Sequence, residues 1–304
     1  MPSPIDPKLT LGEVALTVRN LDTQMGFYQQ VIGLTLLARE DGKAVLGTQD
    51  GHPLVSLFHN PGAKPAPSNA TGLYHLAIAF PTRPDLARWL KHVSPLGLRL
   101  GQSDHKTHEA FYLNDPEGNG IEIYQDWPAE QWPMKDGMMT APDTTAIDIP
   151  GLLRTLAPGD AGWKGAPTGT RMGHVHLKMN DGARTRQFFE GVLGFFITAD
   201  LMGAVFAGAG GYHHHIGTNA WHSKGGPAQP EGTLGLRHYT IELSSTQELE
   251  RVTQQLQDAG VKVVKHEAGL FVKDPAGLPL LIRPQPSTAE SALSALNPAF
   301  SPVH

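Results

Sequence analysis

Residues 11–34 read LGEVALTVRNLDTQMGFYQQVIGL, and residues 172–195 repeat this pattern as MGHVHLKMNDGARTRQFFEGVLGF. Residues 72–80 read GLYHLAIAF, and residues 235–243 repeat them as GLRHYTIEL. Both repeats recur after about 160 residues. A fixed offset of this kind indicates that the chain carries two copies of one architecture.

Each copy contains two successive units, and each unit begins with an alternating strand that leads into a helix. In the first unit, EVALTV at 13–18 alternates between two faces, and Asn20 or Asp22 can cap the helix that ends near Gly33. Short strands separated by tight turns follow. In the second unit, AFYLN and IEIYQ are expected to be strands and DPEGN the turn between them. The sequence therefore predicts an α+β fold. The expected units span residues 10–60, 72–126, 171–222 and 235–284.

These units group into two expected domains, residues 10–126 and residues 171–284. The segment 127–170 between them is rich in Pro, Gly, Thr and Asp, and it is expected to be a connector. The tails, residues 1–9 and 285–304, are expected to be loose or peripheral.

Composition excludes several classes of protein. The net charge of −5 gives no electrostatic reason to bind nucleic acid or an anionic membrane, so neither is expected as a partner. No apolar run approaches the roughly 20 residues that span a bilayer, and residues 1–10 lack the apolar core of a signal peptide. A cytoplasmic location is therefore expected. Because cysteine is absent, a metal ion would have to be held by His, Asp or Glu, and the chain carries 15 histidines.

Four motifs stand out within the units: GLYHLAIAF, DHKTHEAFYLNDPEGNGIEIY at 104–124, GHVHL at 173–177 and GGYHHHIGTNAW at 210–221. With the four units, these motifs resemble the vicinal oxygen chelate superfamily of glyoxalases, bleomycin-resistance proteins and extradiol dioxygenases. The resemblance covers nearly all of residues 11–284 and is nearest to the two-domain, catechol 2,3-dioxygenase-like branch of bacterial proteins. It implies four βαβββ units that form two cupped mixed β-sheets, with a metal held by the first and last strands of paired units.

Polar side chains stand at matched positions of these otherwise apolar strands. A polar or ionised group on an inward strand face is costly without a partner, and metal coordination supplies one. The last strand of unit four departs from the pattern, because leucine stands where unit two has glutamate. The matched positions in units one to four carry Glu13 and Ser56, His75 and Glu122, His174 and His214, and His238 and Leu281.

The pairing of the units decides which of these residues meet. If the units pair in sequence order, neither cup holds two histidines and one carboxylate. If unit two pairs with unit three, and unit one with unit four, one cup collects His75, Glu122 and His174, with His214 as a spare. We favour this second arrangement and predict a metal site made of His75, Glu122 and His174. Weaker alternatives as ligands are His238, Glu13 and His214.

Two histidines and one carboxylate on one face bind ferrous iron and leave adjacent positions open. Together with the resemblance, this set indicates a metal-dependent extradiol dioxygenase that cleaves the ring of a catechol-type diol. The expected cofactor is Fe(II), with Mn(II), Ni(II) and Zn(II) as alternatives. The expected partners are a small aromatic substrate and O2. The identity of the substrate stays open, as does the formation of a homo-oligomer.

Ring cleavage also needs acid–base groups near the metal. His214 is predicted to supply one, because an unperturbed imidazole titrates near neutral pH. Strand alternation sends its neighbours His213 and His215 outward, to the surface or behind the site. Tyr112 lies ten residues before the predicted carboxylate ligand, as an active-site tyrosine does in extradiol enzymes, although a core tyrosine bonded to the backbone would account for it equally well. Further catalytic candidates are His105 and His176.

Two other functions remain open. A glyoxalase-type lyase or isomerase would hold a divalent metal with four protein ligands, including His214. A metal-free binding or resistance protein would use the concave sheet and its aromatic side chains to hold a flat ligand. The aromatic candidates for that role are Trp221, Phe111 and Tyr124.

Overall fold

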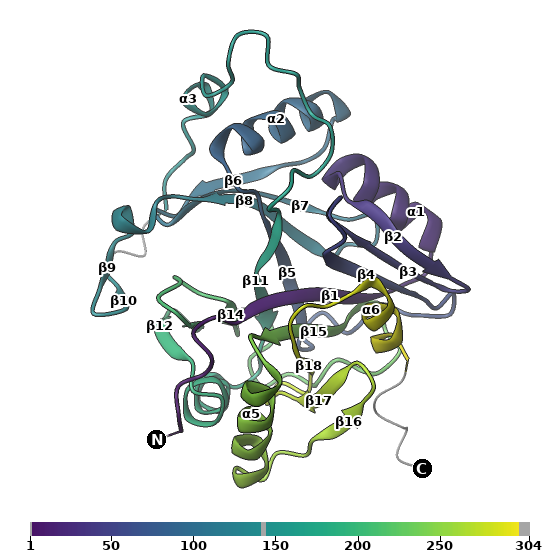
Figure 1. Ribbon diagram of the computed structural model, residues 1–304, viewed down its shortest axis with the longest axis vertical. Helices are drawn as coiled ribbons and strands as arrows, with labels where there is room; N and C mark the ends of the chain where they lie inside the picture. Colours follow the sequence, from purple (N-terminus) through teal and green to yellow (C-terminus); the bar gives the residue numbers. More distant parts are fainter. Residues whose placement is uncertain (1, 141–143, 298–304) are drawn as a thin grey trace.

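The computed structural model describes residues 2–140 and 144–297 of the chain. All four expected units are present, each as a strand, a helix and three further strands (Figure 1). The expected α+β fold is therefore confirmed. Each helix begins where a polar side chain accepts a hydrogen bond from the backbone N–H three residues later. These caps are Asn20, Thr82, Asp181 and Ser245.

The order of elements is the same in every unit. Unit one consists of β1 (Thr10–Val18), α1 (Leu21–Phe27), β2 (Thr35–Glu40), β3 (Lys43–Gly47) and β4 (Pro53–His59). Unit two consists of β5 (Gly72–Ala79), α2 (Arg83–Val93), β6 (Gly101–Asp104), β7 (His108–Asn114) and β8 (Gly120–Asp126). Unit three consists of β11 (Arg171–Lys178), α4 (Gly182–Arg186), β12 (Phe196–Leu201), β13 (Ala204–Gly208) and β14 (Ile216–Asn219). Unit four consists of β15 (Gly235–Leu243), α5 (Thr246–Asp258), β16 (Val264–His266), β17 (Gly269–Lys273) and β18 (Pro279–Pro284).

Units pair across the two halves of the sequence. Within each unit the first strand runs parallel to the last. Between units, β5 pairs antiparallel with β11, and β1 pairs antiparallel with β15. The preferred arrangement is therefore confirmed: units two and three form one cup, called here the 2–3 cup, and units one and four form the 1–4 cup.

The two cups belong to one continuous sheet of sixteen strands in the described part of the chain. The cups join where β1 meets β11, at the pair Leu11 and Met172. Helices cover one face of this sheet, and buried side chains of α2 and α5 belong to the main hydrophobic core. The opposite face forms the interior of each cup.

The C-terminal segment fills the interior of the 1–4 cup. Helix α6 (Ala289–Ala295) lies against β2, β3 and β4 (Figure 1). Its Ala292 packs on Val45, which stands opposite Ser56, and its Ala295 packs on Leu281. The expectation of loose tails is wrong for residues 289–296, because their apolar side chains cover the cup, and for residues 5–9, where Ile5 and Leu9 are buried. Within the tails, residues 1 and 298–304 lie outside the described residues.

The segment expected to be a connector forms structure of its own. It contains a hairpin, β9 (Met134–Lys135) and β10 (Met138–Met139), and a short helix, α3 (Ile149–Leu153). Strand β10 packs on β12 of unit three, and α3 packs on α2 of unit two. The segment therefore contacts both units of the 2–3 cup. No helix in the described residues is long and apolar enough to cross a membrane.

Candidate metal centre

Strand register brings polar side chains together inside the 2–3 cup. Alternation sends Leu76 and Ile78 toward the helices, whereas Ala77 joins a small cluster with Tyr124 inside the cup. Ala77 lies between His174 on β11 and the glutamate of β8, because it is paired with both strands at that point. Since alanine is short, the longer side chains on either side can meet above it.

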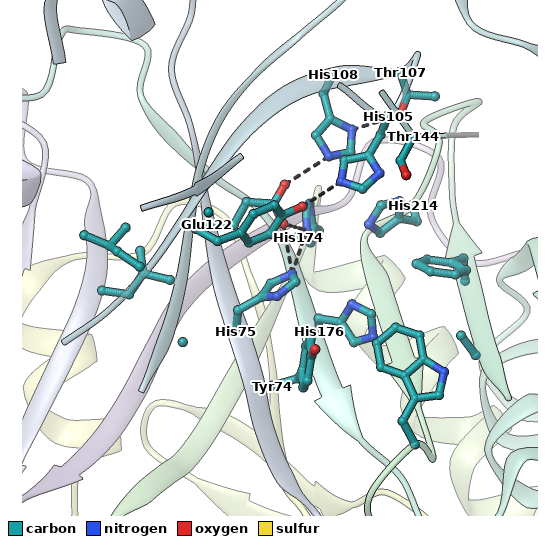
Figure 2. A pocket seen from close by; sticks show the side chains of 18 of the residues that line it. Tyr74, His75, His105, Thr107, His108, Glu122, Thr144, His174, His176 and His214 are labelled. Atoms are coloured by element: carbon teal, nitrogen blue, oxygen red, sulfur yellow. Dashed lines mark hydrogen bonds and ion pairs between the residues drawn. The ribbon is translucent and has the colours of Figure 1, made fainter. Parts of the chain in front are cut away.

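His75, Glu122 and His174 converge on one point (Figure 2). Glu122 Oε2 lies 3.0 Å from His75 Nε2 and 3.2 Å from His174 Nε2, and the two imidazole nitrogens are 3.3 Å apart. All three side chains are buried. Ligands at right angles around an ion, with bonds of about 2.1 Å, stand about 3 Å apart. The predicted ligands therefore fit a single metal ion held on one face.

The proton states of these groups also suit a cation. Metal ions bind ionised carboxylates and neutral imidazoles. Burial by itself raises the pKa of the Glu122 carboxyl, but the imidazoles of His174, His108 and His75 together hold it well below its ordinary value. Burial lowers the pKa of His174 to about 4, despite the neighbouring carboxylate. At neutral pH, Glu122 is therefore anionic and His174 neutral.

His108 orients the carboxylate from behind. The Thr107 hydroxyl lies 2.8 Å from His108 Nδ1, and His108 Nε2 lies 2.9 Å from Glu122 Oε1. If Thr107 donates to Nδ1, then Nε2 carries the ring proton and donates to Glu122. Oε1 is thereby occupied, and Oε2 is left facing the two histidines of the metal group.

The four predicted catalytic residues all line the cavity above this group. The His214 ring lies 4.3 Å from the His174 ring, between centroids. The Tyr112 hydroxyl lies 2.7 Å from His105 Nε2, so this tyrosine is bonded to a side chain and not to the backbone. His176 Nε2 lies 3.0 Å from the Asn219 amide nitrogen, which can donate to it. Burial lowers the pKa of His105 to about 4, so its imidazole is neutral and its Nε2 can accept a hydrogen bond from the Tyr112 hydroxyl.

The cavity has a volume of about 850 Å³ and extends from the metal group toward solvent. Its walls are largely apolar, with charged and polar groups gathered at the metal end. Met139 of the hairpin β9–β10 and Thr144 also border it, so the connector contributes to the wall. The aromatic and aliphatic part of the wall is formed by Tyr74, Leu98, Leu113, Leu201, Phe206 and Trp221.

Three residues of this centre were not predicted from the sequence: the buried His108 and His213, and the partly buried Asp126. Alternation could have found Asp126, because it lies four residues after Glu122 on the same strand and so on the same face. His108 stands opposite Asp126 in the pairing of β7 with β8. Of the two positions expected for His213, the structure shows the one behind the site and not the one at the surface, because its ring is fully buried against that of His108.

The 1–4 cup carries different chemistry at the matched positions. In the 1–4 cup, Ala15 is paired with both Ser56 and His238. In the 2–3 cup, Ala77 is paired in the same way with Glu122 and His174, so Ser56 occupies the position that Glu122 has there. The carboxylate that completes the metal group is therefore replaced by a hydroxyl.

A buried arginine pairs with two carboxylates of the 1–4 cup. Arg283 donates to Glu13 and, at 3.2 Å, to Glu242, and all three residues are buried. His238 Nε2 is 3.6 Å from Glu13 Oε1, which is too far for a hydrogen bond. The cation of this cup is thus a guanidinium. Glu13 and His238, the weaker alternatives as metal ligands, lie here and do not join the group around Glu122.

Comparison with protein families agrees with this architecture. Residues 10–123 and 171–280 match the model of the Glyoxalase/Bleomycin resistance protein/Dioxygenase superfamily. The chain belongs to that superfamily, and the expected family is confirmed.

Two curated relatives are dioxygenases by name. A catechol-2,3-dioxygenase of Bacillus subtilis (strain 168) is 39% identical over 268 residues, which cover 87% of this chain and 93% of that protein. A biphenyl-2,3-diol 1,2-dioxygenase 3 of Rhodococcus globerulus is 29% identical over 119 residues, 38% of this chain and 63% of that protein.

Solved structures show the same fold. A proposed dioxygenase of Bacillus subtilis aligns with a TM-score of 0.68 at 14% identity, over 99% of this chain and 93% of that one. Glyoxalase I of Zea mays aligns with a TM-score of 0.57 at 16% identity, over 95% of each chain. At these identities the likeness concerns the fold alone.

Replacing His108 should weaken metal binding without removing a ligand. His108→Phe frees Glu122 Oε1 and lets the carboxylate rotate, so the affinity for ferrous iron should fall about 10- to 100-fold. Anaerobic equilibrium dialysis against ferrous iron measures the change. His92→Phe, whose imidazole bonds to the Gln30 carbonyl at the surface, is the control and should bind iron as the wild type does. Equal affinities in the two variants would refute the orienting role.

Replacing Arg283 should destabilise the fold. Arg283→Met leaves Glu13 and Glu242 buried without their cation, which should lower the free energy of unfolding by about 3–5 kcal/mol. Urea denaturation followed by circular dichroism measures this loss. Arg251→Met is the matched control, because Arg251 pairs with Glu248 on the partly exposed face of α5 and should lose at most about 1 kcal/mol. A loss at Arg283 no larger than at Arg251 would contradict the assignment.

Proposed function

We propose that this chain is an iron(II)-dependent extradiol dioxygenase that opens the ring of a catechol-type diol. The observation that carries the proposal is the convergence of His75, Glu122 and His174 on one face, at the closed end of a largely apolar cavity. The relationship to a named catechol-2,3-dioxygenase over most of both chains supports it. The proposed partners are a small aromatic diol and O2.

His75, Glu122 and His174 would hold the metal ion. Ferrous iron held there would supply the charge that binds a diol and the electrons that make dioxygen reactive toward the ring. Three protein ligands on one face suit this chemistry, because substrate and oxygen need the remaining positions. The apolar wall holds the aromatic ring and keeps bulk water from the reacting atoms.

The chain itself would move the substrate protons. A diol must lose a proton as it binds, and His214 lies beside the metal group with a neutral imidazole, because burial lowers its pKa well below the ordinary value. The proton would pass from the substrate oxygen to His214, which later returns it. The Tyr112 hydroxyl, which is hydrogen-bonded to His105, would hydrogen-bond a substrate oxygen. His176 would lie beside the aromatic ring of the substrate.

The glyoxalase-type alternative needs a fourth protein ligand. His214 is the candidate, but its Nδ1 lies 2.8 Å from His213 Nδ1 and it stands outside the convergent group of the described residues. A metal-free binding protein has no use for a buried carboxylate beside two buried histidines. The geometry therefore favours the dioxygenase over both alternatives.

Freshly purified protein, reconstituted anaerobically with ferrous iron, should take up oxygen on addition of catechol and form a yellow ring-fission product. Glu122→Ala and His174→Ala should each lose iron binding, because each removes one of three ligands. The measurements are metal analysis, oxygen uptake and absorbance.

His238→Ala is the control, because His238 occupies the other cup, and this variant should retain iron and activity. Loss of iron with His238→Ala would overturn the ligand assignment. Tight nickel or zinc binding without oxygen uptake would replace the dioxygenase by a lyase or isomerase.

A further inference from the structure

A line of two buried histidines and one partly buried carboxylate leads away from the cavity behind His214. His214 Nδ1 lies 2.8 Å from His213 Nδ1, and His213 Nε2 lies 3.0 Å from Asp126 Oδ1. His213 is fully buried, and His214 is nearly so. His214 is labelled at the edge of the cavity in Figure 2. The line therefore connects a residue that faces the cavity with a carboxylate at the end of β8.

The direction of every hydrogen bond in this line is determined at its far end. Asp126 is an acceptor, because Arg171 donates to its Oδ2 at 2.8 Å and Tyr212 donates at 3.0 Å. Burial raises the pKa of this carboxyl, but the bond from His213 and the charge of Arg171 hold it below its ordinary value. His213 must therefore carry its proton on Nε2 and donate to Asp126.

The proton position on the His214 ring follows from the proton position on His213. Burial lowers the pKa of His213 to about 4, so this imidazole is neutral and its Nδ1 has a free lone pair. A separation of 2.8 Å between two Nδ1 atoms requires one proton between them, and only His214 can supply it. His214 therefore carries its proton on Nδ1, which leaves its Nε2 free to accept one.

A second metal ion is the competing interpretation of this region. His108, Asp126 and His213 have donor atoms within 4.8 Å of one another. Each of them is already engaged, since His108 Nε2 bonds to Glu122, and Arg171 supplies a cation to Asp126. The group therefore fits a hydrogen-bonded chain better than an ion.

We propose that Asp126 and His213 are positioning residues that hold His214 in the tautomer whose Nε2 accepts the substrate proton. The tautomer follows from the hydrogen bonds and from the neutral state of His213, and only the origin of the proton rests on the proposed function. In the transfer, the substrate O–H bond breaks and a bond from His214 Nε2 to hydrogen forms. The resulting imidazolium keeps its Nδ1–H bond to His213, and the Asp126 carboxylate stabilises the positive charge through that ring.

Asp126→Asn should reverse both tautomers. Arg171 can only donate, so the amide oxygen of the new side chain must face it, and the amide nitrogen then faces His213 Nε2. His213 would shift its proton to Nδ1, and His214 would be protonated on Nε2, where the substrate proton should arrive. The side-chain 15N spectrum of histidine-labelled, metal-free protein reports each tautomer directly. We expect Nδ1–H at His214 in the wild type and Nε2–H in the variant.

The reconstituted enzyme gives an independent readout. Asp126→Asn should bind ferrous iron as the wild type does, and its kcat for catechol should fall by about 10²- to 10⁴-fold, the usual contribution of a general base. His215→Gln is the matched control, because His215 belongs to the same histidine run and bonds to the Ala209 backbone instead. It should keep the wild-type tautomer at His214 and the wild-type kcat.

The wild-type spectrum alone can overturn the proposal, even if a variant fails to fold. Protonation of His214 on Nε2 in the wild type would refute it. So would an unchanged His214 tautomer in folded Asp126→Asn. Absence of oxygen uptake with the expected tautomers would instead refute the proposed function and leave the assignment of Asp126 and His213 intact.

Discussion

The antiparallel pairing of β5 with β11 is the constraint on which the candidate site depends. Those strands come from opposite halves of the sequence, and their register sets His174 against Ala77 and His75 against His176. Neither half alone supplies all of His75, Glu122 and His174. A slip by one residue would turn every one of these side chains to the other face of the sheet. The chemistry of the site is thus a property of one strand interface.

The two cups show how one scaffold yields two different interiors. In the 2–3 cup, the buried Glu122 carboxylate faces His75, His108 and His174, and the cavity stays open. In the 1–4 cup, Arg283 supplies the positive charge from within the chain, and α6 fills the space. Each buried carboxylate needs such partners, because an unpaired charge that has lost its water is strongly destabilising. The two cups therefore share one backbone arrangement but differ in their buried charged side chains.

The repeat in the sequence was sufficient to predict the four units, because strand alternation and turn motifs are local signals. His75, Glu122 and His174 could be predicted as a group for the same reason, once the polar positions of the repeats were matched. His108 and His213 could not be, since their roles depend on contacts across β7, β8 and the loop before β14, whereas strand alternation could have found Asp126. The packing of α6 could not be predicted either, because its alanines show a role only through the cup wall on which they pack.

The pairing of β1 with β15 has a consequence for the order of folding. Val14 and Tyr239 are neighbours in space but about 225 residues apart in the chain. A ribosome releases unit one long before its partner exists, so β1 must wait, unpaired on that edge, until unit four and α6 have been synthesised. Units two and three are nearer in sequence and can close first. Contacts of such long separation slow folding and leave apolar edges exposed in the interval. The nascent chain can therefore complete the 2–3 cup before the 1–4 cup, although unit one of the 1–4 cup is synthesised first.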